Sequence, residues 1–217
     1  MTKPLLLLLG PNAQPVTNSA SEIRVTMQAE AQDPTFESVD LVEAPFKWWD
    51  GLEAARGAIV DHQPSVVLLI ATDPDARIVR VAGGARNRAS PERDASGHCW
   101  PGRALSPGGA QYLPATLPGD SLLEALRGSQ CPAERVGHPG LGVANRCFYG
   151  LLASAGPVRI GCLHVPVSLE SARRFNFATP SCYNRAMLLA AVRACLDGAQ
   201  HAITQCLGAY AARQGPG

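Results

Sequence analysis

Apolar residues follow two different spacings along the chain. Unbroken apolar runs at residues 5–9 and 65–71 are typical of strands buried on both faces, and shorter stretches alternate apolar and polar positions. Other segments place apolar residues three and four positions apart, as amphipathic helices do. We expect strands at residues 5–9, 39–43, 65–71, 76–82, 135–136 and 158–165, and helices at 18–30, 48–62, 120–127, 143–153 and 181–212.

The alternation of strands and helices predicts an α/β fold, a three-layer α/β/α sandwich with an open, mostly parallel sheet. The 217 residues contain no repeat and no linker, so residues 1–217 are expected to form a single domain. Residues 83–109, called the excursion below, are rich in Gly, Pro, Arg and Ser and are expected to be irregular. A loop of that length in a compact domain is usually functional or makes contacts. Gly198 and Gly208 are the positions at which the last helix can break.

The composition excludes several classes of partner. The formal net charge is +1 and 17% of residues are charged, which gives no reason to expect a nucleic acid or a membrane surface. No apolar run reaches the length of about 18 residues that a membrane span needs, and the run at residues 5–9 is too short for an export signal. Seven cysteines without paired or metal-binding spacing predict free thiols in a reducing cytoplasm, with no metal and no cofactor.

Two short motifs carry a family resemblance. Residues 143–150 read Val-Ala-Asn-Arg-Cys-Phe-Tyr-Gly, and residues 161–166 read Gly-Cys-Leu-His-Val-Pro. They resemble the nucleophile and histidine regions of pyroglutamyl peptidase I, a cysteine peptidase in which Val-Cys-Asn opens a helix and Gly-x-x-His-x-Pro follows. The order of elements is similar over almost the whole chain. The resemblance therefore implies the pyroglutamyl-peptidase-I-like fold and, from that family, a homo-oligomer (a dimer or tetramer).

At the position of the family nucleophile this chain has Ala144, while the family histidine is present as His164. A methyl group cannot attack a carbonyl carbon, so the resemblance does not extend to thiol catalysis. His164 is a candidate general acid/base or orienting group, or else a hydrogen-bonded core residue. Cys147 lies one helical turn after Ala144 and is a candidate displaced thiol, although packing in the core is the favoured reading.

The family glutamate has two possible counterparts. An alignment without gaps from Pro64 places Ala82 on it, with Asn87 on the family's following asparagine. The segment at residues 90–97 imitates the same family block and would make Glu92 the acid, but it needs an insertion and a compensating deletion. We favour the ungapped alignment, in which alanine replaces both the cysteine and the glutamate.

Four further residues are candidates for ligand binding. Asp73 and Asp75 follow a strand that is expected to be buried, at the edge where open α/β sheets hold their ligands, although they also suit a turn around Pro74. Asn18 and Asn145 fall on asparagines of the family. By contrast, residues 10–15 lack the aromatic side chains that flank the lactam ring in the family, and His-Pro-Gly-Leu-Gly at 138–142 stands where the family has Ala-Gly-Thr-Tyr.

Three functions remain open on the sequence, all with a small-molecule ligand or partner. We favour a repurposed relative that acts without hydrolysis on a small amide, lactam or carbonyl compound, for example as a cyclase or isomerase of specialised metabolism, with His164 as acid/base. The first alternative is a pyroglutamyl peptidase, an enzyme that removes N-terminal pyroglutamate, inactivated by a Cys-to-Ala substitution at position 144. The second alternative is a non-catalytic binding or scaffold pseudoenzyme.

Overall fold

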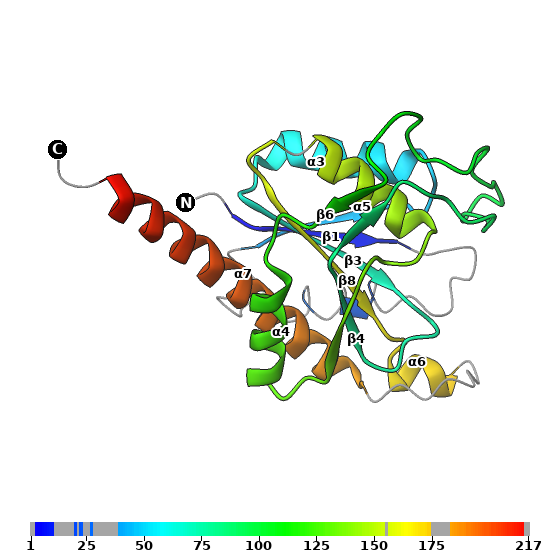
Figure 1. Ribbon diagram of the computed structural model, residues 1–217. Coiled ribbons are helices and arrows are strands. Elements are labelled where there is room, and N and C mark those ends of the chain that lie inside the picture. Colours follow the sequence, from blue (N-terminus) through cyan, green and yellow to red (C-terminus); the bar gives the residue numbers. More distant parts are fainter. Residues whose placement is uncertain are drawn as a thin grey trace.

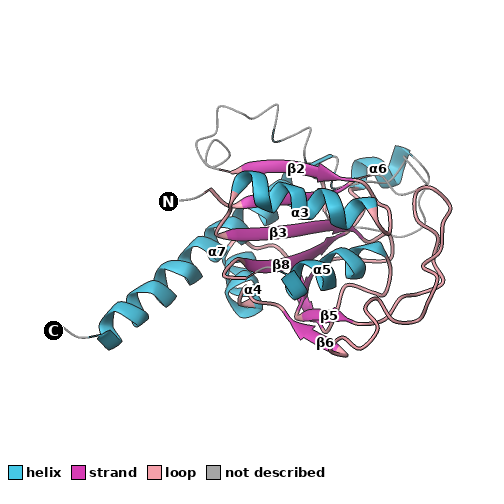
Figure 2. Cartoon of the chain, turned by 90° about the horizontal axis from the view of Figure 1, so that it is seen from above, coloured by secondary structure: helices cyan, strands magenta, loops and turns pink. Residues whose placement is uncertain are grey.

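The computed structural model describes residues 3–10, 20, 22–23, 27, 39–154, 156–174 and 183–214, with the backbone alone at residues 174 and 203–214. Within these residues, helices cover both faces of a central sheet whose strand order is β2-β1-β3-β8-β4-β7 (Figures 1 and 2). The strands of this sheet are β1 Leu5–Leu9, β2 Asp40–Ala44, β3 Val66–Thr72, β4 Val79–Ala82, β7 Ala133–Val136 and β8 Arg159–Val165. A separate two-stranded ribbon pairs β5 (Gly84–Arg86) with β6 (Tyr112–Pro114).

The central sheet is mostly parallel, as the sequence predicts. β1 pairs in parallel with β2 and with β3, and β3 pairs in parallel with β8. The direction reverses once, because β4 runs antiparallel to β8 and parallel to β7. The amino-terminal end of β4 therefore lies at the same edge of the sheet as the carboxyl ends of β3 and β8.

The five leucines of β1 show why this strand is central. Each of them is at most 1% exposed, since β1 lies between two strands and helices cover both faces. Leu6 and Leu8 pack in one apolar cluster, whereas Leu5, Leu7 and Leu9 pack in the other on the opposite face. Both clusters together form the three-layer core that the unbroken apolar run predicts.

Helices lie on both faces of the sheet (Figure 2). α3 (Asp50–His62) and α5 (Val143–Ser154) lie on the face to which Leu7 points, and α4 (Gly119–Gly128) and α7 (Arg185–Gln214) lie on the other. α5 approaches α3 so closely that a Cβ on Gly150 would be 2.4 Å from a methyl group of Leu52. A side chain at position 150 would therefore force the Leu52 side chain to shift.

Several element boundaries differ from the prediction. β4 begins at Val79 rather than at residue 76, because residues 73–76 form a turn in which the N–H of Ala76 donates to the carbonyl of Asp73 at 3.2 Å. The short helix α6 (Leu169–Arg174) is not predicted by the sequence pattern. α7 is continuous rather than broken, and the predicted start of that helix at residue 181 lies outside the described residues.

Gly198 has a packing role in α7 instead of ending it. A Cβ at this position would lie 2.8 Å from the Cβ of Ala125, so the glycine lets α7 and α4 pack closely. The helix predicted at residues 18–30 is described only at residues 20, 22–23 and 27, which are helical. Of these, Ala20, Ile23 and Met27 are buried against the α7 side of the sheet.

The excursion is irregular after β5 but is held in place by buried polar side chains. Asn87 donates to the carbonyls of Ser106 and Gly109 at 2.7 and 3.1 Å and accepts from the N–H of Ser106 at 2.8 Å. Asp94 is 1% exposed and accepts hydrogen bonds from three backbone N–H groups, those of Trp48, Ser96 and His98. The excursion is therefore a fixed structure against α3, which agrees with the expectation that it makes contacts.

No helix among the described residues is long and apolar enough to cross a membrane.

Candidate functional site

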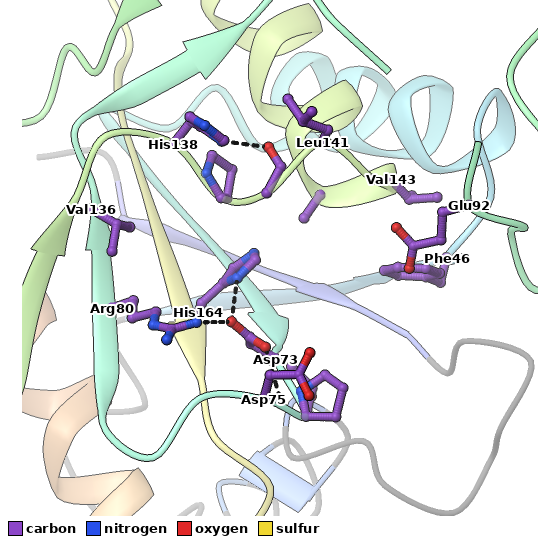
Figure 3. A pocket seen from close by; sticks show the side chains of 16 residues that line it. Phe46, Asp73, Asp75, Arg80, Glu92, Val136, His138, Leu141, Val143 and His164 are labelled. Atoms are coloured by element: carbon purple, nitrogen blue, oxygen red, sulfur yellow. Dashed lines mark hydrogen bonds and ion pairs between the residues drawn. The ribbon is translucent and has the colours of Figure 1, made fainter. Parts of the chain in front are cut away.

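A cavity of about 350 Å³ lies at the edge of the sheet where β3 and β8 end, in front of the first turn of α5 (Figure 3). Five of the residues predicted from the sequence line it together: Asp73, Asp75, Glu92, Ala144 and His164. The other lining residues are Phe46, Thr72, Pro74, Arg80, Val136, His138, Pro139, Gly140, Leu141, Gly142 and Val143. The fold thus brings the ends of two strands, the segment before α5 and part of the excursion to one place.

The imidazole of His164 belongs to a charged network at the strand ends. His164 in β8 lies opposite Arg80 in antiparallel β4, and its Nδ1 is 3.5 Å from Oδ2 of Asp73, at the outer limit of hydrogen-bonding distance. The same oxygen of Asp73 accepts a hydrogen bond from Nη1 of Arg80 at 2.6 Å. Nε of Arg80 donates to the carboxylate of Glu134 at 2.9 Å. Arg80 therefore fixes the carboxylate that faces the imidazole.

The second nitrogen of His164 has no such partner. A carboxylate beside Nδ1 favours the tautomer that carries its proton there, which leaves Nε2 as a hydrogen-bond acceptor. Nε2 is buried, and within the described part of the chain it has no hydrogen-bond partner. Most buried polar atoms have a partner, so this nitrogen marks a position where a donor from a ligand is stabilising.

Asp73 is held as a carboxylate. Burial alone would raise its pKa, but the contact with His164, the N–H of Asp75 and the guanidinium of Arg80 outweigh burial and lower the pKa from 3.8 to about 2. The N–H of Asp75 donates to Oδ1 of Asp73 at 3.0 Å, which confirms that these residues form a turn around Pro74. Asp73 thus has both predicted roles, in the turn and in the wall of the cavity.

The first turn of α5 forms the opposite wall. Val143 begins the helix and Ala144 follows it, so the N–H groups near Ala144 belong to the helix end that attracts negative charge. In a cysteine peptidase this position lowers the pKa of a thiol and provides donors for an oxyanion. Ala144 is 5% exposed and offers only its methyl group, so this wall keeps the helix end but not the nucleophile.

The pairing of β4 with β8 places Ala82 on the sheet relative to His164. Ala82 lies opposite Cys162 and Arg80 lies opposite His164, so all four residues share one face of the sheet. A longer side chain at position 82 would therefore lie on the same face as the imidazole, which supports the ungapped alignment. Ala82 itself does not line the cavity, and the carboxylate beside His164 comes instead from Asp73 at the end of β3.

The thiols that the structure describes lie away from the cavity. Cys147 is fully buried beside α3, where a Cβ on Gly51 would be 3.3 Å from its sulfur, and burial raises the pKa of this thiol to about 12. Burial also raises the pKa of the Cys162 thiol. None of the described cysteines lines the cavity; they are Cys99, Cys131, Cys147, Cys162 and Cys195. The structure therefore gives Cys147 a place in the core and not that of a displaced nucleophile.

Glu92 lines the cavity but does not approach His164. Figure 3 shows Glu92 across the cavity from the imidazole, beside Phe46 and Val143. Its Oε2 accepts a hydrogen bond of 3.4 Å from the hydroxyl of Ser90. Glu92 therefore does not stand where an acid that orients the histidine would lie, and any role of this carboxylate is directed toward the contents of the cavity.

Asn145, predicted to bind ligand, has a different role. Its side chain is 0% exposed and does not line the cavity. It accepts from the N–H of Arg86 at 2.9 Å and donates to the carbonyls of Arg86 and Arg88 at 2.8 and 3.0 Å. These bonds attach the excursion to α5, so Asn145 is a structural residue. Asn18, the other asparagine predicted to bind ligand, lies outside the described residues.

Among the lining residues that the sequence did not predict, Arg80, Phe46 and His138 supply a guanidinium, an aromatic ring and an imidazole. Arg80 lies two residues before Ala82 in the same strand, so the strand pattern places both side chains on one face. That pattern could not show that β4 runs antiparallel beside β8. Nδ1 of His138 lies 2.6 Å from the carbonyl oxygen of Gly140, which orients the ring. No group of three or more His, Cys, Asp or Glu side chains in the described ranges is arranged to hold a metal ion.

The fold and the site together define an α/β protein of the cysteine-peptidase type whose nucleophile position is filled by alanine. The family model described as pyroglutamyl peptidase matches residues 10–204. The chain belongs to the pyroglutamyl peptidase family. Membership is therefore established over most of the chain, including both motifs that carry the resemblance.

Individual relatives agree with this assignment. A pyrrolidone-carboxylate peptidase of Mycobacterium marinum is 28% identical over 193 residues, which covers 83% of this chain and 85% of the relative. Pyrrolidone-carboxylate peptidase 2 of Photorhabdus laumondii is 32% identical over 137 residues, covering 60% of this chain and 62% of the relative. The crystal structure of pyroglutamyl peptidase I from Bacillus amyloliquefaciens superposes with a TM-score of 0.81 at 21% identity, over 92% of this chain and 97% of the other. This structural likeness confirms the predicted fold.

Proposed function

We propose that this chain binds a small carbonyl-bearing compound, such as an amide or lactam, in the cavity between His164 and α5, and that it forms no covalent thioester with it. The observation that carries the proposal is the position of Ala144. It lies in the wall of the cavity, at the helix end that suits a nucleophile, yet none of the described thiols lines that cavity. Covalent catalysis needs an activated nucleophile, and a methyl group cannot supply one.

The other half of the site supports a role for the imidazole. Asp73 orients Nδ1 of His164, and Arg80 fixes Asp73, so the ring is held by a network rather than by apolar packing alone. Such a carboxylate–imidazole pair is suited to transfer a proton or to polarise a carbonyl group at Nε2. A non-hydrolytic conversion such as cyclisation or isomerisation uses only these abilities, and it is the finer form of the proposal.

The experiment is ligand-observed NMR with piperidin-2-one, a neutral lactam, at millimolar concentration. Saturable binding to the wild-type chain, weakened at least about tenfold by His164→Ala, supports the proposal, because about tenfold corresponds to the loss of one good hydrogen bond. Glu124→Gln, an exposed substitution on α4 away from the cavity, is the matched control. Absence of binding to the folded wild-type chain would overturn the proposal.

A second candidate function is a pyroglutamyl peptidase inactivated at position 144. The family match over residues 10–204, together with relatives that are named pyrrolidone-carboxylate peptidases, favours it. The two candidates differ in the result of Ala144→Cys. If a single substitution removed an otherwise intact activity, the restored thiol hydrolyses a fluorogenic pyroglutamyl amide. If the site has been rebuilt, as Ala82 and Asp73 indicate, the restored thiol is present but the amide is not cleaved.

We further infer a homo-oligomer, a dimer or a tetramer, that works in the cytoplasm. The free state of the five described cysteines supports a reducing compartment, and the family resemblance supports the assembly. Size-exclusion chromatography with light scattering tests the assembly directly. A monomer at micromolar concentration would contradict it.

A further inference from the structure

The charge of the cavity is the feature that identifies a class of ligand. Three carboxylates and one guanidinium line it, those of Asp73, Asp75, Glu92 and Arg80, so its formal charge is −2 when both histidines are neutral. Arg80 is already paired with Asp73 at 2.6 Å, and it also binds Glu134 outside the lining. The uncompensated negative charge therefore resides on Asp75 and Glu92.

The two carboxylates are available to a ligand. The side chain of Asp75 has no hydrogen-bond partner among the residues that the structure describes, because only its backbone N–H is engaged. Glu92 accepts one long hydrogen bond, 3.4 Å from the hydroxyl of Ser90. No cationic side chain of the described residues pairs with either carboxylate, so both retain most of their capacity to accept hydrogen bonds.

Gly142 is the residue that allows Glu92 to lie in the wall. A Cβ at position 142 would be 2.3 Å from Oε2 of Glu92 and 3.3 Å from its Cδ, so any other residue would displace the carboxylate.

Phe46 completes an environment for a cation. Its ring lines the cavity beside Glu92 (Figure 3). A protonated amine is attracted both to a carboxylate and to the face of an aromatic ring, whereas a neutral lactam gains from neither interaction to the same extent. The acceptor Nε2 of His164 lies on the far side, so one compound can place an N–H or O–H donor at the imidazole and an ammonium group at Glu92.

From this arrangement we propose that the ligand is a small carbonyl compound that also carries a protonated amine, with the amine held between Glu92 and Phe46. This rests on the proposed function, since it names the ligand class of the same cavity. The neutral or anionic pyroglutamyl group is a poor match to this end of the site. Selectivity for the cation arises from charge and not from the size of the ring.

The test compares three ligands of similar size at pH 6.5: 3-aminopiperidin-2-one, whose amine is protonated, the neutral piperidin-2-one, and the anionic 5-oxoproline. We expect the wild-type chain to bind the cationic lactam about tenfold more tightly than the neutral one, and the anion most weakly. In Glu92→Gln the ratio of cationic to neutral affinity falls to about twofold, and in Glu124→Gln it is unchanged. Gly142→Ala lowers the same ratio although it alters no charge, because the new methyl group displaces the carboxylate.

The possible outcomes distinguish failure of this inference from failure of the proposed function. Equal affinity for the neutral and the cationic lactam overturns the cation site but leaves the proposed function standing. A preference for the cation that Glu92→Gln does not reduce also overturns it. If neither lactam binds the folded protein, the proposed function and the inference are both overturned.

Discussion

The two walls of the cavity differ in the side chains that they present to its contents. At the strand ends, Asp73 and Arg80 hold His164 in a network of hydrogen bonds and ion pairs. At the start of α5, the helix end is intact but Ala144 offers only a methyl group. One wall therefore carries a polar group suited to proton transfer, while the other offers no nucleophile. The proposed use of the imidazole without a covalent step rests on this difference.

Thiol reactivity tests the wall formed by α5 and should show the largest effect. In the native wild-type chain, the buried Cys147, whose pKa is raised to about 12, should resist alkylation at pH 7.5, while the exposed Cys99 is labelled. In Ala144→Cys, the new thiol at the helix end should be labelled more than about 100-fold faster than Cys147. Mass spectrometry of iodoacetamide-treated native protein measures both rates. Rapid native labelling of Cys147 would show that it is accessible and would return it to consideration as a nucleophile.

Substitutions at the neighbouring residues Ala144 and Asn145 of α5 test which of the two side chains stabilises the fold. Asn145→Ala removes three hydrogen bonds of a fully buried side chain and leaves the N–H of Arg86 unpaired, so the free energy of unfolding should fall by about 3 kcal/mol. Ala144→Ser adds one hydroxyl at the cavity wall and should cost less than about 1 kcal/mol. Urea denaturation followed by circular dichroism measures both. Equal losses for the two variants would contradict the structural role of Asn145.

Asp73→Asn should lower the free energy of unfolding of the protein by about 2 kcal/mol at pH 7. The reason is that the folded-state pKa of Asp73 lies about two units below its ordinary value. Asp75→Asn, at an exposed carboxylate, should change stability by less than about 0.5 kcal/mol.

The same carboxylate sets a pH dependence. A lowered pKa means that the contribution of Asp73 is fully present well above pH 3.8 and is lost as the pH falls through 3.8 toward 2. The difference in stability between the wild-type chain and Asp73→Asn should therefore be constant near neutral pH and should shrink below about pH 4. A difference that persists unchanged at pH 2 would show that Asp73 acts through packing rather than charge.

The sequence predicted the layers of the fold because burial leaves a direct pattern. The apolar run at residues 5–9 and the helical spacing at residues 143–153 each appear at the expected place, as β1 and α5. The elements missed are α6, whose six residues are too few for a helical period to be recognised, and the ribbon strands β5 and β6, which have three residues each. The continuity of α7 through Gly198 depends on contact with Ala125, which spacing in one helix cannot reveal.

The lining residues were predictable where a family motif or the end of a buried strand marks the residue. His164 and Ala144 follow from the family motifs, and Asp73 follows from its place after a buried strand. The alignment of the glutamate left Ala82 and Glu92 as alternatives, and neither provides the carboxylate beside the imidazole. The identity of that partner depends on how β3, β4 and β8 pair in the sheet, including one antiparallel pair. The spacing of residues within a single strand does not show the order of the strands.

The most direct test of lost thiol chemistry is a single assay on Ala144→Cys in which the new thiol is titrated and the release of fluorophore from a pyroglutamyl amide is followed in the same sample. We expect a folded protein with a reactive thiol at position 144 and no release of fluorophore above that of the wild-type chain. Cleavage of the amide in step with the titrated thiol would contradict it, because the site would then be an intact peptidase lacking one sulfur atom.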